Sequence, residues 1–197
     1  MEPSRDYGCH QNPPEKGFAD NTVIIYSADN GYYMGDRGFA GKWSHYEQSI
    51  RVPLIIYDPR LPEARRGRVL SELALNVDLP ATFLDLAGAA LPATYQGASL
   101  LPVMHGKPAP WREDFLAEHL LEYGARIPKW EGVRGRRYMY ARYFEHDYEF
   151  LHDLETDPNQ LKNFAQDPAY GETLKQMRTR CDTLADHYAR RHTPQAE

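Results

Sequence analysis

Two short segments in the first sixty residues are apolar at nearly every position. Residues 22–28 are rich in β-branched side chains and end in the Asp-Asn-Gly turn at 29–31. Residues 52–57 show a similar pattern. Both segments predict strands that are buried on both faces of a sheet. The glycine-rich segment between them is long for a compact fold, which is typical of a functional loop.

The pattern becomes helical after residue 75. Asn76 or Asp78 can cap a helix, Pro80 suits its first turn, and Gly88 ends it. Residues 89–112 are rich in proline and predict loops.

The last third of the chain predicts a small sheet and a long helix. A short strand is expected to end at Glu118-His119, and antiparallel strands should follow at 133–137, 138–143 and 147–154. The helix is expected at about 170–188. One face of it repeats apolar side chains at spacings of three and four: Tyr170, Leu174, Met177, Cys181, Leu184 and Tyr188. This stripe favours a surface that packs on the core over one that binds a partner, so Cys181 is interpreted as a packing residue.

Composition excludes several classes of protein. The chain has 197 residues, 42% of them hydrophobic, and a net charge of −5, which argues against a disordered chain and against nonspecific nucleic-acid binding. The sequence contains no apolar run of about 18 residues, so it predicts no membrane span. The first six residues lack the apolar stretch of a secretory leader. Cys9 and Cys181 are too few for a disulfide framework or a thiolate zinc site.

Three residues are candidates for an anion and metal site. Asp29 and Asn30 offer hard oxygen donors at the end of a predicted strand, which suits Ca²⁺ or Mg²⁺, although Ca²⁺ takes about six to eight oxygens. Lys42 is either an ordinary surface lysine or a fixed cation that neutralises a tetrahedral anion beside the metal. Trp43 and Tyr46 are candidates for the walls of that pocket. We expect Asp29, Asn30 and Lys42 to converge at the C-terminal ends of both predicted strands.

Other polar residues are weaker candidates. His45 is a candidate for lining the lysine segment, and His119 is either a substrate contact or an ordinary polar strand end. Arg134 and Arg137 either meet an acidic sugar or are solvated hairpin charges. The eight histidines show no zinc-binding spacing.

Several linked motifs in order resemble the sulfatase family over residues 20–190, and the bacterial iduronate- and heparan-sulfatases in particular. The motifs are Asp20-Asn21-Thr22-Val23-Ile24-Ile25, Ser27-Ala28-Asp29-Asn30-Gly31-Tyr32, Met34-Gly35-Asp36-Arg37-Gly38, Gly41-Lys42-Trp43, Tyr46-Glu47, Ile50-Arg51-Val52-Pro53-Leu54-Ile55, Leu86-Ala87-Gly88, Gln96-Gly97-Ala98-Ser99-Leu100, Glu118-His119, Glu131-Gly132-Val133-Arg134 and Leu151-His152-Asp153-Leu154-Glu155-Thr156-Asp157-Pro158.

The resemblance implies roles for matching residues. In the family, the Asp and Asn that match Asp29 and Asn30 help bind Ca²⁺, and the lysine that matches Lys42 contacts the sulfate. Family members hydrolyse sulfate esters or sulfamates with a formylglycine made from the first residue of a C/S-x-P-x-R motif. In this sequence Cys9 and Cys181 do not open that motif, and Met1 stands before the similar Glu2-Pro3-Ser4-Arg5. No precursor of formylglycine is therefore present in the chain.

The expected fold is α/β, the C-terminal portion of an alkaline-phosphatase-like sandwich, with a small antiparallel sheet packed on a C-terminal helix. We expect an irregular tail or linker at 1–20, the C-terminal part of the sulfatase core at 21–112, and a small α+β subdomain at 113–197. Family members are often periplasmic or secreted, and the compartment of this chain stays open.

The resemblance implies a saccharide or other sulfate ester as substrate, and the missing N-terminal part of the enzyme as a partner. Two alternatives stay open. One is a catalytically silent sulfatase remnant, and the other is a phosphate or phosphonate ester hydrolase of the same superfamily.

Overall fold

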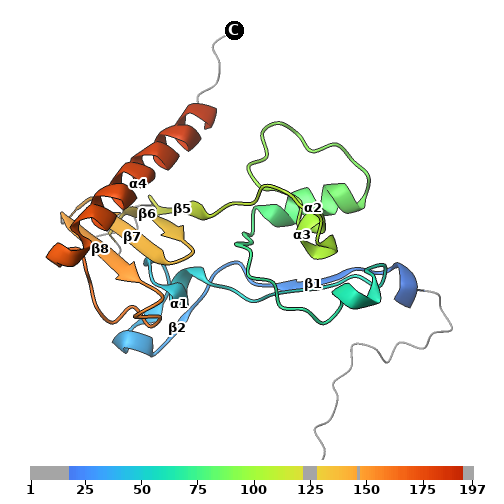
Figure 1. Ribbon diagram of the computed structural model, residues 1–197, viewed down its shortest axis with the longest axis horizontal. Helices are drawn as coiled ribbons and strands as arrows, with labels where there is room; N and C mark the ends of the chain where they lie inside the picture. The colour runs from blue at the N-terminus through green and yellow to red at the C-terminus, as the bar shows by residue number, and fades with distance from the viewer. Residues whose placement is uncertain (1–17, 122–127, 146, 193–197) are drawn as a thin grey trace, which may run out of the picture.

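The structure is a computed structural model that describes residues 18–121, 128–145 and 147–192. The tail expected at 1–20 lies outside the described residues as far as residue 17, and its end forms the 3-10 turn η2 (Ala19–Asn21). Figure 1 shows two regions side by side. One contains the β1 ribbon with α2 and α3, and the other contains a four-stranded sheet crossed by α4.

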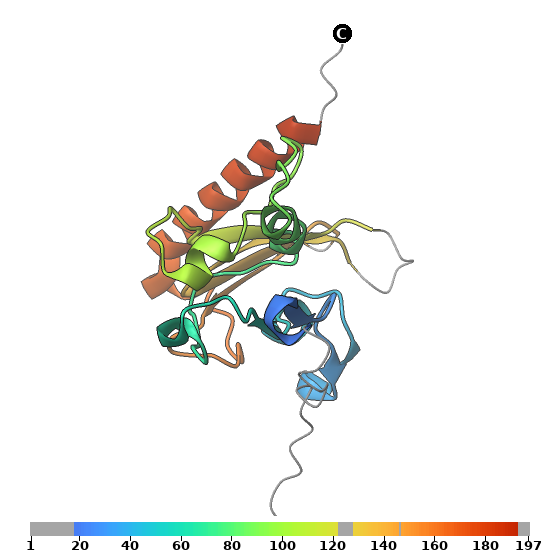
Figure 2. The ribbon, with the colours of Figure 1, turned by 90° about the vertical axis from the view of Figure 1, so that its right-hand side faces the viewer.

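The first region is built on a two-stranded antiparallel ribbon of β1 (Ile24–Ser27) and β4 (Leu54–Tyr57). Figures 1 and 2 place α2 and α3 over one side of this ribbon. On the other side the cross-strand partners Tyr26 and Ile55 are each 62% exposed. The predicted burial of both faces is therefore wrong for this chain, because no described segment packs on that second face.

The glycine-rich segment between these strands is folded rather than irregular. Here β2 (Tyr33–Met34) pairs antiparallel with β3 (Ala40–Gly41), and the 3-10 turn η3 (Asp36–Gly38) joins them. The short helix α1 (Glu47–Ile50) leads back to the ribbon. We call residues 42–46, between β3 and α1, the lysine loop.

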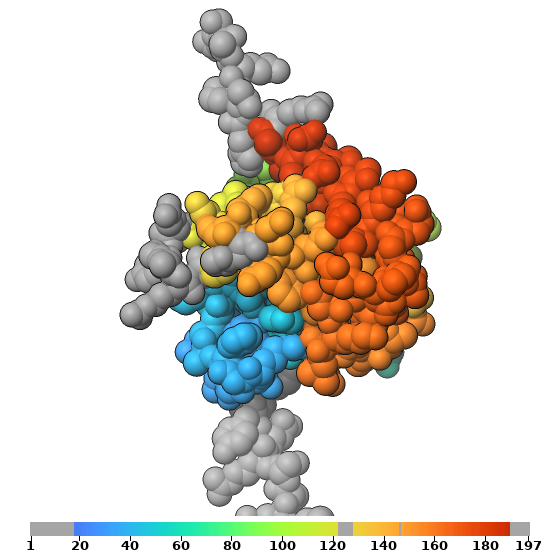
Figure 3. Space-filling view, turned by 90° about the vertical axis from the view of Figure 1, so that its left-hand side faces the viewer, coloured from blue at the N-terminus to red at the C-terminus, as the bar shows by residue number. Residues whose placement is uncertain are grey.

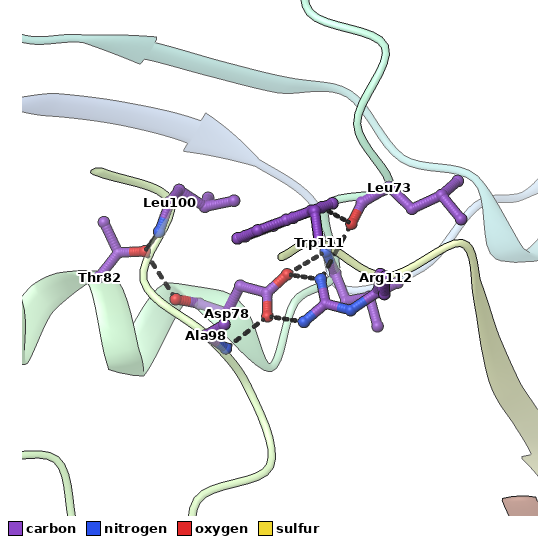
Figure 4. Close-up of polar contacts among 8 residues, drawn as sticks. Leu73, Asp78, Thr82, Ala98, Leu100, Trp111 and Arg112 are labelled. Atoms are coloured by element: carbon purple, nitrogen blue, oxygen red, sulfur yellow. Dashed lines mark hydrogen bonds and ion pairs between the residues drawn. The ribbon is translucent and has the colours of Figure 1, made fainter. Parts of the chain in front are cut away.

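The helix predicted after residue 75 is confirmed as α2 (Asp78–Leu86). Its first residue, Asp78, is fully buried and receives Arg112 Nη1 and Nη2 at 2.5 and 2.6 Å on its two carboxylate oxygens, as Figure 4 shows. The proline-rich stretch that predicted loops also contains a short helix, α3 (Leu101–His105), with a proline in its first turn and left-handed Gly106 at its end. The 3-10 turn η4 (Glu63–Arg65) precedes both helices.

The second region is an antiparallel sheet in the order β5-β6-β7-β8, which confirms the strands predicted there. Its strands are β5 (Asp114–His119), β6 (Trp130–Gly135), β7 (Tyr138–Tyr143) and β8 (Tyr148–Asp153). The first predicted strand, 133–137, begins earlier in the structure because Trp130 pairs with both His119 and Tyr143.

The C-terminal helix is confirmed as α4 (Gly171–His192), preceded by the 3-10 turn η6 (Pro168–Tyr170). Its apolar stripe packs on one face of the sheet, where Leu174, Cys181 and Leu184 are buried against Val133 and Leu151. Cys181 is fully buried, which confirms its interpretation as a packing residue. Within the described residues, no helix has the length and apolar character needed to cross a membrane.

Candidate active site

The turn after β1 is held in one conformation by a hydrogen bond of its own and by contacts from two other segments. The Asn30 N–H donates to Asp29 Oδ1 at 2.9 Å, and Asn76 Nδ2 donates to the Asp29 carbonyl at 2.9 Å. The Gly31 N–H donates to the Ser49 carbonyl at 2.8 Å. A Cβ at position 31 would lie 2.1 Å from the Gln48 carbonyl oxygen, so only glycine fits this approach. The turn thus fixes where Asp29 and Asn30 lie.

Lys42 reaches back to this turn. Its Nζ donates to Asn30 Oδ1 at 2.5 Å and lies 4.0 Å from Asp29 Oδ2. The Lys42 side chain is 31% exposed and that of Asp29 is 88% exposed, so the group opens to solvent. The expected convergence of the three residues is therefore confirmed, whereas their roles as ligands stay predictions.

The expected position of this group needs one correction. Because β1 and β4 are antiparallel, Ser27 pairs with Leu54 and Ile24 with Tyr57. The site therefore lies at the C-terminal end of β1 and the N-terminal end of β4. The apolar patterns alone carry no information about strand direction, and a site at the C-terminal ends of both strands requires two strands that point the same way.

Trp43 presents its indole beside Lys42 from a strained backbone. Its φ of 85° lies in the left-handed region, which is costly for a bulky residue. The conformation is held because the Trp43 N–H donates to Ser49 Oγ at 2.9 Å and Trp130 Nε1 donates to the Trp43 carbonyl at 2.7 Å. The indole is 42% exposed, and Lys42 Nζ lies 5.8 Å from its ring centre.

His119, at the end of β5, faces the same indole. The ring centres of Trp43 and His119 are 6.5 Å apart. His119 Nε2 is buried and has no hydrogen-bond partner among the described residues. A buried imidazole nitrogen without a partner is unusual in a folded protein, and the role of His119 as a substrate contact stays a prediction.

His45 lies in the interior, which does not fit the predicted contact with substrate. It is 1% exposed, and its two ring nitrogens lie 2.8 Å from the Tyr143 hydroxyl and 3.1 Å from His152 Nε2. The ring of its neighbour Tyr46 is covered by the Arg37 guanidinium at 4.1 Å, and burial raises the pKa of Tyr46. His45 therefore anchors the lysine loop to the interior of the fold.

The two hairpin arginines have structural partners. Arg134 Nε and Nη2 each lie 3.0 Å from a carboxylate oxygen of Glu47 and so tie β6 to α1. Arg137 donates to both oxygens of Asp153, and these hydrogen bonds lower the pKa of Asp153 to about 2. Neither arginine is free to meet an acidic sugar without giving up these pairs.

Sequence reasoning missed the residues that support the site from a distance. Asn76, Tyr143 and His152 hold the turn and the lysine loop, yet they lie between 47 and 107 residues away from the groups they contact. His152 falls in a motif of the resemblance, but no local pattern pairs it with His45. Figure 3 shows the blue segment around β2 and η3 against the C-terminal strands in yellow and orange.

The donor set for a metal is incomplete within the part of the chain that the structure describes. Asp29 and Asn30 provide oxygen atoms of the type that Ca²⁺ prefers, but they are two, against the usual six to eight or so. Among the described residues, no three His, Cys, Asp or Glu side chains gather in a way that would hold a metal ion. The oxygen atoms of Asp29 and Asn30 therefore fit part of a Ca²⁺ site, and the other ligands are not found among the described residues.

The chain does not fit a formylglycine nucleophile. Cys181 is fully buried in α4, where burial raises its pKa to about 12, and Asp182-Thr183 follow it in place of the motif. A reactive nucleophile requires an accessible position, so Cys181 does not supply one.

Comparison with known proteins identifies the family. The family model for the C-terminal region of N-sulphoglucosamine sulphohydrolase matches residues 35–187. An N-acetylglucosamine-6-O-sulfatase of Bacteroides thetaiotaomicron is 34% identical over 167 residues, which cover 82% of this chain and 29% of the relative.

Two solved structures share the fold. One, an enzyme in complex with its substrate D-glucosamine-2-N,6-O-disulfate, has a TM-score of 0.82 and 31% identity, and the match covers 93% of this chain and 38% of that one. The phosphonate monoester hydrolase of Agrobacterium radiobacter has a TM-score of 0.77 and 26% identity over 88% of this chain and 36% of its own. The chain thus spans less than half the length of these relatives. It belongs to the sulfatase family, with the alkaline-phosphatase-like fold, and corresponds to the C-terminal part of these enzymes.

Proposed function

We propose that the chain provides the sulfate-binding side, and part of the Ca²⁺ site, of an active site that hydrolyses sulfate esters of sugars. The observation that carries this proposal is the convergence of Lys42, Asn30 and Asp29 at one solvent-facing edge. The Lys42 ammonium is held in place by two side chains that carry oxygen atoms. A cation fixed in this way can neutralise the negative charge of a sulfate group during its transfer.

Lys42 has the catalytic and substrate-binding role in this proposal. Its ammonium carries three protons, and one of them is donated to Asn30 Oδ1. The others are available to the oxygens of a sulfate group. Asp29 and Asn30 would hold Ca²⁺, with Mg²⁺ as the alternative, together with ligands from elsewhere. When bound, such an ion polarises an oxygen of the ester.

Trp43 and His119 are proposed to orient the sugar. An exposed indole beside a cation offers an apolar face to a pyranose ring, and the imidazole of His119 lies beside that indole with the ring centres 6.5 Å apart. The substrate of the structural relative is a sulfated glucosamine, which supports sulfated amino sugars as the substrate class here.

The remaining part of the active site is proposed to come from a sulfatase N-terminal region that covers the open face of the ribbon. The exposed pair Tyr26 and Ile55 is an apolar surface of the kind that packs against another element of a sheet sandwich. The relatives extend well beyond the matched part, which is consistent with a nucleophile supplied from there.

A phosphonate or phosphate ester hydrolase is the second candidate. The structural match to a phosphonate monoester hydrolase favours it, and a lysine cation binds both kinds of tetrahedral anion. Comparing sulfate with methylphosphonate as ligands of the chain separates the two candidates, since the proposed function requires sulfate to bind at least as well.

The decisive experiment measures ligand binding by the chain itself with NMR titrations. Sulfate should shift the signals of Lys42 and Trp43, and Lys42→Ala should abolish the shift, while the control Lys129→Ala, at an ion pair with Glu145, should keep it. Ca²⁺ should bind with a dissociation constant of roughly 10⁻³ M or weaker, and Asp29→Asn should remove it. Sulfate binding that survives Lys42→Ala would refute the proposed site.

A further inference from the structure

Two histidine rings meet in the interior between the lysine loop and β8. His45 Nε2 lies 3.1 Å from His152 Nε2, and both side chains are 1% exposed. The outer nitrogens of the pair are also engaged. His45 Nδ1 lies 2.8 Å from the Tyr143 hydroxyl, and His152 Nδ1 lies 2.8 Å from the Lys162 carbonyl oxygen.

These contacts allow one arrangement of protons when both rings are neutral. A carbonyl oxygen only accepts, so His152 Nδ1 must carry a proton and donate it to Lys162. His152 Nε2 is then an acceptor, and His45 Nε2 must donate to it. His45 Nδ1 is left as an acceptor for the Tyr143 hydroxyl. Every polar atom of the chain of contacts is satisfied, and each tautomer is fixed by its neighbour.

The surroundings disfavour positive charge on the pair. Aromatic rings enclose His45 with ring-centre distances between 4.1 and 6.2 Å: Tyr46, Trp130, Tyr143 and Phe150. The charged side chains that act on the pair are Arg37, which repels a proton on either ring, and Asp157, which attracts one to His152. Tyr33 and Tyr46 act on the Tyr143 hydroxyl, and burial raises the pKa of Tyr143.

The same pair joins two parts of the fold. His45 belongs to the lysine loop, and His152 is 107 residues away on β8. Next to them, Trp130 Nε1 of β6 holds the Trp43 carbonyl. We propose that His45 and His152 form a neutral, tautomer-locked latch that docks the lysine loop on the C-terminal sheet and opens the loop when the pair takes up protons. The latch follows from this geometry and does not depend on the proposed function.

Protonation disrupts the contacts in two stages. A first proton on His152 Nε2 requires His45 to reverse its tautomer, which removes the acceptor of the Tyr143 hydroxyl proton. A second proton sets two donors face to face at 3.1 Å. Burial first, then the charges of His152 and Arg37, hold the pKa of His45 well below its usual range, and burial is also the main cause that lowers the pKa of His152.

The direction of the pH effect follows from these lowered pKa values. Unfolded histidines take up protons near pH 6.5, before the folded pair does. The stabilisation is therefore complete above that pH and is lost as pH falls through and below 6.5 towards the folded pKa values. For each histidine with a lowered pKa, the equilibrium constant for unfolding rises by up to about tenfold for every pH unit of acidification within that window.

The experiment is a pH titration of the chain by ¹⁵N NMR of its imidazole and indole groups. We expect His152 protonated at Nδ1 and His45 at Nε2, and both rings should take up further protons only below pH 6.5, the usual pKa of an imidazole. At lower pH, the Trp130 indole signal should move together with the titration of the pair. The methyl signals of Val133 and Leu151, under α4, should stay in place.

Three outcomes would overturn the latch. The first is that either ring titrates near pH 6.5. The second is that the Trp130 signal does not change when the pair titrates. The third is that the core methyl signals are lost in the same step. The double variant His45→Gln/His152→Asn, which keeps polar groups but cannot titrate, should lack the Trp130 step. His187→Gln, at an exposed position on α4, should retain it. The titration of the unmodified chain decides the question even where the double variant does not fold.

Discussion

The indole N–H of Trp130 donates to the main-chain carbonyl of Trp43 at 2.7 Å and thereby joins β6 to a loop 87 residues earlier in the chain. Trp130 is 2% exposed, so this hydrogen bond is shielded from water. The bond holds the carbonyl of a residue whose φ is strained and whose neighbour is Lys42. The position of the lysine thus depends on the C-terminal sheet as well as on the ribbon.

Trp130→Phe should test this dependence. The change leaves the Trp43 carbonyl without its donor and should lower the free energy of unfolding by about 1–3 kcal/mol. Urea unfolding measures the loss, and NMR should show shifts at Lys42. The matched variant Trp111→Phe removes an indole bond to the Leu73 carbonyl and should leave the Lys42 signals unchanged. Equal shifts in both variants would contradict the link.

Breaking the buried pair of Asp78 and Arg112 should be costly. Asp78 is fully buried and also accepts from the Leu75 and Ala98 N–H groups at 2.8 and 2.9 Å. Asp78→Ala should therefore destabilise the chain by about 3–5 kcal/mol, because Arg112 loses its counterion. Asp85→Ala, at an exposed position on the same helix, should cost much less. Chemical denaturation of both variants provides the comparison.

The purified chain should not hydrolyse an aryl sulfate, with or without Ca²⁺. It has no formylglycine precursor, and loss of a nucleophile commonly lowers the rate by several orders of magnitude. A colorimetric assay at high protein concentration measures this. Turnover that disappears with Lys42→Ala would contradict the expectation, because it would require a nucleophile within these residues.

Asp153 should contribute to acid stability. Hydrogen bonds from Arg137 lower its pKa from 3.8 to about 2 in the folded chain. A carboxyl whose pKa is lowered by folding stabilises the fold at pH values above the pKa that it has in the unfolded chain. This contribution is lost as pH falls from 3.8 towards 2. Asp153→Asn should flatten the dependence of the unfolding free energy on pH in that window. Asp20→Asn, at an exposed position in η2, should keep the slope.

Cys181 should resist alkylation in the folded chain. It is fully buried, and burial raises its pKa to about 12, so almost no thiolate forms at pH 8. Treatment with iodoacetamide followed by peptide mass analysis should show no label at residue 181 until the chain is unfolded in urea. Rapid labelling under native conditions would mean that α4 detaches from the sheet.

The amino-acid sequence by itself determined the elements whose information is local. The spacing of Leu174, Cys181 and Leu184 identified α4 and its buried face, because a helix repeats every 3.6 residues wherever it packs. The turn at 29–31 and the succession of C-terminal strands followed from turn residues and β-branched runs. Linked motifs then placed Lys42, Asn30 and Asp29 together by resemblance.

Only the tertiary structure decided the features that depend on residues far apart in the chain. The apolar runs that form β1 and β4 are compatible with either strand direction. Their antiparallel pairing places the site at the C-terminal end of β1 and the N-terminal end of β4. The sequence makes His45 a candidate for lining the lysine segment, but the structure places its Nε2 3.1 Å from Nε2 of His152, which lies 107 positions later. Burial and hydrogen-bond partners arise from the packing of distant segments, and a local pattern of side chains does not specify which segments will meet.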